Sequence, residues 1–223
     1  MELLHLLLDL VANLDAYLAQ AVGIFGLWTY LLLFLAVFCE TGLVIASIIP
    51  SDSLLFVAGA LGGVGLLHIV VLFFLFIAAA ILGDSLNYWL GSVIGARAFD
   101  GRFRYLKPEH LAQARAFFDR HGGKAVILAR YVPLMRALVP FVSGAGAMDY
   151  GRFLTYNIIG SIVWVSTFLF AGYFFGSLPI VQDNFSLMLL AVVILSFVPA
   201  GLEFSRNKIS AFRQKKDNAV QEL

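Results

Sequence analysis

Long apolar runs dominate the chain, and their lengths predict membrane-spanning helices. The clearest run covers residues 66–90, and others cover 27–46, 153–175 and 185–204. A transmembrane helix needs about 20 predominantly apolar residues, which each run provides. Transmembrane β-strands would instead give short segments of alternating polarity. The pattern predicts an all-α integral membrane protein, and the composition agrees, because 61% of the residues are hydrophobic and only 13% are charged.

Two apolar segments are interrupted by proline and by charge. The first contains Glu40, Pro50 and Asp52, and the second contains Arg130, Pro133, Arg136 and Pro140. Proline breaks a helix and frees backbone polar groups, which a membrane tolerates only inside protein or beside a cavity. The first segment fits either a span followed by a dipping loop or a re-entrant hairpin. We predict re-entrant helical hairpins at about 28–62 and 125–147.

Positive charge is confined to the second half of the chain. All 15 Lys and Arg residues lie at or beyond Arg97, with clusters at 97–124 and in the tail. Basic loops lie on the cytoplasmic side, so both clusters are expected there. Within 97–124, Pro108 suits a helix start and Gly122-Gly123 an end, which predicts an interfacial amphipathic helix. A nucleic-acid-binding role is disfavoured, because membrane spans flank the basic residues.

This sidedness sets the expected topology. The spans 153–175 and 185–204 supply two crossings between the cytoplasmic clusters, so the hairpin at 125–147 enters and leaves on the cytoplasmic side. The first hairpin then opens outward. The chain divides into an N-terminal amphipathic or short membrane helix at 1–26, a membrane domain at 27–178, a C-terminal transmembrane helix at 179–205 and a basic cytoplasmic tail at 206–223.

A weak internal repeat agrees with this topology. At an offset of 85 residues, Ala58-Gly59-Ala60 aligns with Ser143-Gly144-Ala145, and Asn87–Ser92 aligns with Gly172–Ser177. Each half has a broken segment, small residues, and a span that ends in an aromatic residue and glycine. Opposite orientation of the two halves predicts an inverted repeat, as in many transporters.

The charges in the broken segments are the candidate site. Charges within a membrane are costly and mark partners, water or substrate. Arg130 and Arg136 cannot lose their charge, and a guanidinium suits phosphate oxygens. The carboxyl groups of Glu40 and Asp52 can take up protons, so they could exchange the arginines with an anion. A structural ion-pair cluster is the alternative.

Other polar residues give weaker signals. Asp84 could make a helix–helix hydrogen bond or relay protons, and Asn157 is expected to join helices. Trp164 is expected to pack or to lie in an interfacial belt. The four histidines lack metal-ligand spacing and none lies in a broken segment, so we expect no metal, no cofactor and no catalytic residue.

The motifs resemble those of the DedA family of bacterial membrane proteins. The resemblance covers roughly residues 28–178 and lies in the acidic segment Glu40–Asp52, in G-D-x-x-x-Y-x-x-G-x-x-x-G from Gly83 to Gly95, and in R-Y-x-P-x-x-R…A-G-x-x-x…N-x-x-G…W from Arg130 to Trp164. One departure is Pro50-Ser51-Asp52, where many relatives have Pro-Gly-Glu. Structural roles are expected at Pro50, Pro133, Pro140, Gly83, Tyr88, Gly91, Gly95, Gly144, Gly146, Asn157 and Gly160.

The resemblance implies a re-entrant-helix fold in the bacterial inner membrane. It also implies proton-motive-force-linked transport of undecaprenyl phosphate, the lipid carrier for cell-wall polymers. Alternatives are a proton-coupled exporter of small ions or drugs, a phospholipid scramblase, and, less favoured, a lipid phosphatase. Apolar Gly/Ala surfaces permit a homo-oligomer without requiring one.

Overall fold

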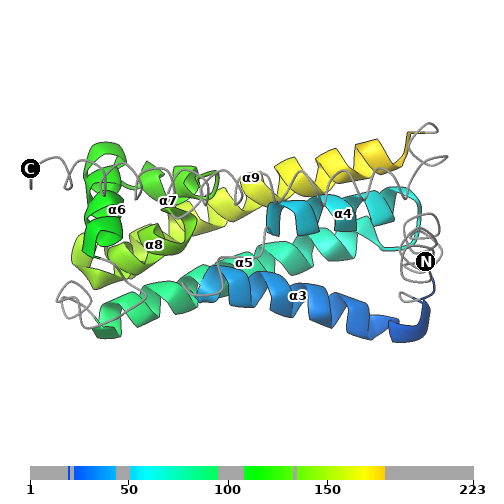
Figure 1. The fold of residues 1–223 in the computed structure, drawn as a ribbon, viewed down its shortest axis with the longest axis horizontal. Helices are drawn as coiled ribbons and strands as arrows, with labels where there is room; N and C mark the ends of the chain where they lie inside the picture. The colour runs from blue at the N-terminus through cyan, green and yellow to red at the C-terminus, as the bar shows by residue number, and fades with distance from the viewer. Residues whose placement is uncertain (1–19, 21–22, 44–50, 95–107, 133–134, 179–223) are drawn as a thin grey trace, which may run out of the picture.

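The computed structural model describes residues 20, 23–43, 51–94, 108–132 and 135–178, and these residues form helices without any strand. The elements, labelled as in Figure 1, are α3 (Leu27–Gly42), α4 (Ser51–Gly63), α5 (Ile69–Ile94), α6 (Pro108–His121), α7 (Lys124–Ala129), α8 (Met135–Val142), the short π-helical segment η3 (Ser143–Ala147) and α9 (Tyr150–Gly176). The predicted all-α class is confirmed.

The two longest helices, α5 and α9, run antiparallel through the centre of the molecule (Figure 1). Near the start of α5, Phe73 packs on Phe170 of α9 with ring centroids 5.5 Å apart. Near its other end, the Tyr150 hydroxyl donates to Ser85 Oγ at 3.3 Å. Both helices are long and apolar enough to cross a membrane, as the runs at 66–90 and 153–175 predicted.

The shorter helices complete two similar halves. After α4 comes the long helix α5, and after α8 and η3 comes the long helix α9. Some of the shorter elements exchange partners between the halves, because α4 lies along α9 while α8 and η3 lie along α5. Since α5 and α9 are antiparallel, the halves have opposite orientations, as an inverted repeat requires.

Glycines make these crossings close and show the register of the repeat. A Cβ at Gly172 would overlap with the backbone of Phe56, and one at Gly91 would overlap with the backbone of Phe141. The short helices therefore correspond at an offset of 85 residues (Phe56 and Phe141), as the sequence predicted. The long helices correspond at an offset of 81 (Gly91 and Gly172), so the predicted alignment of Asn87–Ser92 with Gly172–Ser177 is wrong by one helical turn.

The path from α8 to α9 is broken at two points, within α8 and in η3. Pro140 lies inside α8, and because proline has no N–H, the helical bond to the Arg136 carbonyl is missing. Gly146 then adopts a φ of +110°, a conformation that favours glycine. The Asp149 carboxylate next accepts a hydrogen bond from the Arg152 backbone N–H at 2.9 Å and caps α9.

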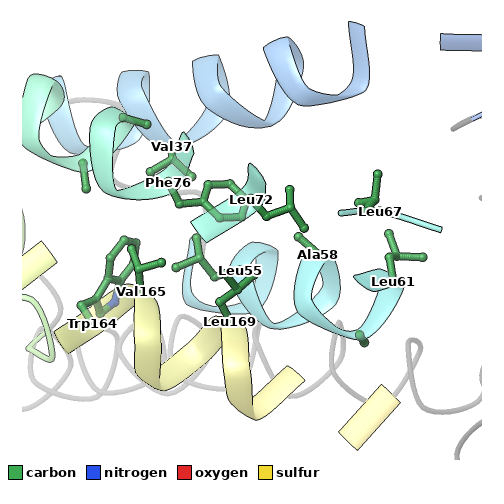
Figure 2. Close-up of a cluster of buried hydrophobic side chains, with 13 residues drawn as sticks. Val37, Leu55, Ala58, Leu61, Leu67, Leu72, Phe76, Trp164, Val165 and Leu169 are labelled. Atoms are coloured by element: carbon green, nitrogen blue, oxygen red, sulfur yellow. The ribbon is translucent and has the colours of Figure 1, made fainter. Parts of the chain in front are cut away.

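Apolar side chains from all the central helices form the core. Figure 2 shows one cluster, in which Trp164 and Leu169 of α9 face Leu55 of α4 and Phe76 of α5. A second cluster joins α6, α7, α8 and α9 and includes Phe118 and Phe153. Burial of these side chains removes apolar surface from the membrane or from water and holds the two halves together through dispersion contacts.

Several predictions about topology are not tested by these helices. In α6, Ala114 and Phe118 are buried whereas Arg115 and Arg120 are exposed, but its position at a membrane interface stays a prediction. The re-entrant geometry of the two hairpins and the sidedness also stay predictions. Some predicted features lie outside the described residues, namely Pro50, Pro133, Gly95 and the C-terminal span and tail. Of the helix predicted within 1–26, only a part is described.

Candidate functional site

Arg136 lies where three helices meet, and both predicted carboxylates contact it. The last turn of α3 carries Glu40, the first turn of α4 carries Asp52, and α8 carries Arg136. Arg136 Nη2 donates to Glu40 Oε2 at 3.0 Å, and Nη1 donates to Asp52 Oδ1 at 3.3 Å. The same Nη2 donates to Ser51 Oγ at 2.6 Å. The sequence predicts that these two acids face both arginines; the structure shows this for Arg136, whereas Arg130 pairs with Asp84 instead.

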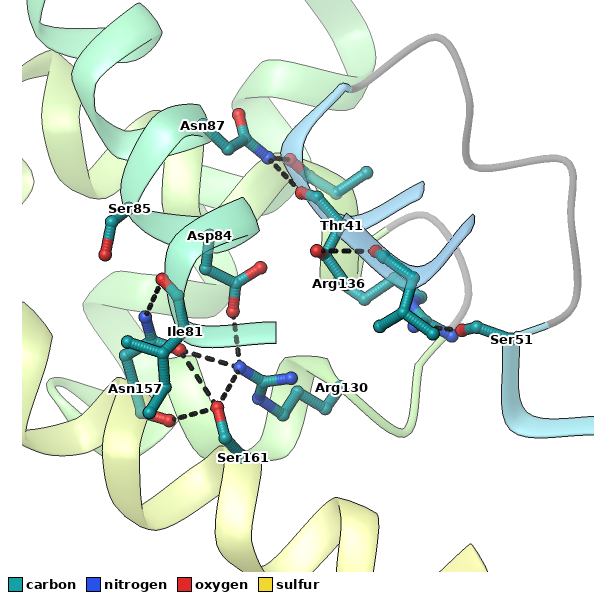
Figure 3. A network of polar contacts seen from close by, with 12 residues as sticks. Thr41, Ser51, Ile81, Asp84, Ser85, Asn87, Arg130, Arg136, Asn157 and Ser161 are labelled. Atoms are coloured by element: carbon teal, nitrogen blue, oxygen red, sulfur yellow. Dashed lines mark hydrogen bonds and ion pairs between the residues drawn. The ribbon is translucent and has the colours of Figure 1, made fainter. Parts of the chain in front are cut away.

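Arg130 belongs to a separate polar cluster, seen in Figure 3. It follows α7, and its Nη2 lies 2.5 Å from Asp84 Oδ2 of α5, 2.7 Å from Asn157 Oδ1 and 2.8 Å from Ser161 Oγ, both of α9. Asn157 also donates to the Ile81 carbonyl at 3.2 Å, so it joins α9 to α5 as predicted. Asp84 is thus an ion-pair partner of Arg130, a role that the sequence analysis did not assign to it.

The two arginines differ in accessibility. Arg136 and Asp52 retain 12% and 40% of their side-chain exposure, whereas Arg130 and Asp84 retain 4% and 5%. Arg130 Nε is buried without a hydrogen-bond partner among the described residues. Of these two clusters, that of Arg136 combines a permanent cation with an accessible carboxylate, so it is the better candidate for binding a solute.

Trp164 connects the two clusters. Its ring lies 5.6 Å from the Arg130 guanidinium carbon and 5.1 Å from that of Arg136, both within the range of cation–π attraction. Its indole Nε1 donates to Asp52 Oδ1 at 2.8 Å. Of the two roles expected from the sequence, packing is confirmed, because Trp164 is fully buried. The polar contact with Asp52 was not predicted.

Asn87 of α5 hydrogen-bonds the backbone next to two residues of the Arg136 cluster. Its Nδ2 donates to the Ala137 carbonyl at 2.8 Å and contacts the Thr41 carbonyl at 3.4 Å. These carbonyls belong to the residues that directly follow Arg136 and Glu40. Sequence reasoning gave Asn87 no role. An amide side chain inside a long apolar run was nevertheless a usable signal for a hydrogen bond between helices.

Several predicted packing residues surround these clusters. A Cβ at Gly160 would lie 3.1 Å from Arg130 Nε, so this glycine leaves space for the arginine. A Cβ at Gly83 would overlap with the Thr41 side chain, and one at Gly144 would overlap with the carbonyl of Tyr88. The Tyr88 hydroxyl itself donates to the Met148 carbonyl at 2.8 Å. These contacts agree with the packing roles that were expected.

The described residues contain no group of three or more His, Cys, Asp or Glu side chains arranged to hold a metal ion. The carboxylates, guanidinium groups and neutral donors of the two clusters can pair charges, form hydrogen bonds and take up protons at the carboxyl groups.

Comparison with known proteins identifies the family. The sequence matches the VTT domain over residues 49–174, which includes α4, α5, α8 and all but the last two residues of α9. Protein DedA of Escherichia coli strain K12 is 42% identical over 219 residues, which is 97% of this chain and 100% of that protein. The chain belongs to the DedA family. The resemblance inferred from the motifs is thereby confirmed.

Other relatives of this DedA-family protein have names that describe membrane proteins. A membrane protein of Mycobacterium tuberculosis strain H37Rv, Rv0364, is 37% identical over 198 residues, 85% of each chain. Inner membrane protein YghB of Escherichia coli strain K12 is 30% identical over 200 residues, 87% of each chain. No solved structure matches the chain. Family membership and the two apolar helices together make this DedA-family chain a membrane protein.

Proposed function

We propose that the protein is a proton-linked transporter of an anionic lipid and that this lipid is a polyprenyl phosphate such as undecaprenyl phosphate. The supporting observation is the Arg136 cluster, in which a permanent cation is held by two carboxylates and one of them, Asp52, is accessible. The location we propose is the bacterial inner membrane, consistent with the name of the relative YghB.

Charge counting explains how protons and an anion can compete at this cluster. One guanidinium faces two carboxylates, so the fully ionised cluster has one excess negative charge and repels a phosphate. Protonation of one carboxyl makes the cluster neutral, and protonation of both leaves Arg136 as a free cation. A guanidinium then binds phosphate oxygens through parallel N–H donors. Proton uptake on one side and proton loss on the other would link anion transport to the proton gradient.

The fold supports a lipid as the transported anion. The cluster lies between broken helices of opposite halves, and inverted repeats place substrate sites at such an interface near the middle of the bilayer. We propose that the hairpins at about 28–62 and 125–147 are re-entrant and open to opposite sides, with the loop 97–124 and the tail cytoplasmic. A polyprenyl chain could then remain in the bilayer while only its phosphate crosses.

The test is transport of labelled undecaprenyl phosphate into proteoliposomes with and without an imposed proton gradient. We expect saturable transport that depends on the gradient and is abolished by Arg136→Ala. The matched control is Arg115→Ala, because Arg115 is an exposed arginine whose ion-pair partner among the described residues is Asp119 on its own helix. Glu40→Gln and Asp52→Asn should remove the dependence on the gradient.

Two results would contradict the proposal. One is transport that persists in Arg136→Ala at the parental rate, which would make the cluster a structural ion-pair lock. The other is folded parent protein that neither binds nor moves the lipid, while a small ion or drug crosses in exchange for protons. That result would favour the exporter that the sequence analysis kept as an alternative.

A further inference from the structure

Trp164 has a polar contact that the proposed transport cycle leaves unexplained. An indole N–H can donate a hydrogen bond but cannot accept one, and when buried it needs an acceptor. Trp164 is fully buried, and its acceptor is Asp52, one of the carboxylates that the cycle would neutralise. When Asp52 takes a proton or turns away, the indole N–H loses the charge that it faces.

The donors around Asp52 converge on one oxygen atom. Asp52 Oδ1 accepts from Trp164 Nε1 at 2.8 Å and from Arg136 Nη1 at 3.3 Å. Two N–H donors aimed at a single anionic oxygen are the arrangement that binds an oxyanion. Of the two donors, Trp164 is fully buried and Arg136 is 12% exposed. The Asp52 side chain is 40% exposed. The carboxylate is therefore the part of this arrangement that a solute can replace.

We propose that Asp52 Oδ1 occupies the position of a phosphate oxygen of the substrate, and that Trp164 Nε1 and Arg136 are the ligands of that oxygen after exchange. This inference rests on the proposed function and adds a specific ligand to its site. The ligand chemistry is a phosphate monoester, whether a lipid head group or free phosphate. The exchange breaks no covalent bond, because one anionic oxygen replaces another in front of the same two donors.

An indole donor suits a transport site. It strengthens anion binding without adding positive charge, so a returning Asp52 carboxylate still competes for Arg136. Its ring is fixed by contact with both guanidinium groups, which holds the N–H direction through the exchange. A lysine or arginine at this position would add a third cation beside two arginines and would oppose release of the anion.

The first experiment compares Trp164→Phe with the parent. Phenylalanine keeps an aromatic ring over both guanidiniums and removes the N–H. We expect the Kd for labelled undecaprenyl phosphate to rise about tenfold or more, since hydrogen bonds to charged groups contribute roughly 1.5–3 kcal/mol. Trp89→Phe is the control, because Trp89 is exposed on α5. The affinity and the unfolding temperature of this control variant should equal those of the parent.

A second comparison separates direct contact with the ligand from an effect through Asp52. Asp52→Ala removes the competing carboxylate, so this variant should bind undecaprenyl phosphate more tightly than the parent. If Trp164 contacts the phosphate, Trp164→Phe should still weaken binding about tenfold in the Asp52→Ala background. If Trp164 only positions Asp52, the effect of Trp164→Phe disappears in that background, and the inference is wrong.

The remaining outcomes distinguish this inference from the proposed function. Radiolabelled inorganic phosphate is titrated in parallel by equilibrium dialysis, which measures its binding to the parent and to Trp164→Phe alike. Binding of inorganic phosphate alone, with the same dependence on Trp164, would keep the inference and overturn the lipid. Parental affinity and transport of the lipid in Trp164→Phe would overturn the inference and keep the proposed function. Absence of binding of either probe to folded parent and to Asp52→Ala would overturn the inference.

Discussion

Replacement of Asp84 by Asn tests how strongly Arg130 depends on its buried counter-charge. Asp84 Oδ2 and Arg130 Nη2 lie 2.5 Å apart, and both side chains are buried, with 5% and 4% of their surface exposed. At an effective dielectric constant of 20, two unit charges at that distance attract by roughly 7 kcal/mol. The substitution removes this attraction and also the cost of burying the carboxylate, but it leaves a permanent cation without its counter-charge.

The expected net loss is smaller than the Coulomb attraction. Removal of one partner of a buried pair costs roughly 3–5 kcal/mol, and Asp84→Asn should lie near about 3 kcal/mol because the new amide oxygen still accepts a hydrogen bond. For a chain of this size, that loss lowers the unfolding temperature by roughly 6–12 °C. The assay is thermal unfolding in detergent, followed by size-exclusion elution of the protein that remains folded.

Two companion variants make the result interpretable. Asp84→Leu combined with Arg130→Met removes both charges and should be more stable than Asp84→Leu alone, because an apolar pair often replaces a buried ion pair at little cost. Asp119→Asn breaks the exposed pair with Arg115 and should cost about 1 kcal/mol or less. Parental stability of Asp84→Asn, or no recovery in the double variant, would refute the reasoning.

Three further predictions concern packing, positioning and capping. Gly91→Ala should lower the unfolding temperature because its Cβ would overlap with the Phe141 backbone, whereas Gly151→Ala should not, since its Cβ meets no atom closer than 3.6 Å. Asn87→Leu should remove hydrogen bonds to two backbone carbonyls, cost about 1–3 kcal/mol in thermal unfolding, and slow transport more than an equally destabilising core variant. Asp149→Ala should cost about 1 kcal/mol in the same unfolding assay, because α9 loses its N-cap, and parental stability would contradict this.

The sequence predicted the long helices and the candidate charges because both signals are local. Apolar runs at 66–90 and 153–175 fix α5 and α9 to within a few residues, since a bilayer requires such lengths. Charges in apolar segments identified Arg136 with Glu40 and Asp52. Each of these signals depends only on a residue and its neighbours along the chain.

Pairing and register were less accessible to sequence reasoning because they depend on contacts between distant residues. The partner of Arg130 is Asp84, 46 positions away, and nothing local favours it over Glu40. The register of the long helices was misread because small residues recur every four positions, so a shift of one turn also aligns glycine with glycine. Accessibility, which separates Arg136 from Arg130, depends on how α4 and α9 cover each residue.

The exchanged packing of the short helices also determines which parts of the molecule can move as units. Glycines hold α4 against α9, and α8 against α5, at backbone contact. We therefore expect each of these helix pairs to move as one unit, although its two helices come from different halves of the sequence. The contact of Asp52 with Arg136 joins one such unit to the other, and Arg130 bridges them because it bonds both Asp84 of α5 and Asn157 of α9. Any rocking that preserves the glycine contacts therefore changes these polar contacts, together with apolar contacts between α5 and α9 such as Phe73 with Phe170. The interface that moves in an alternating-access cycle would then include titratable and exchangeable contacts, so its free energy would depend on their protonation.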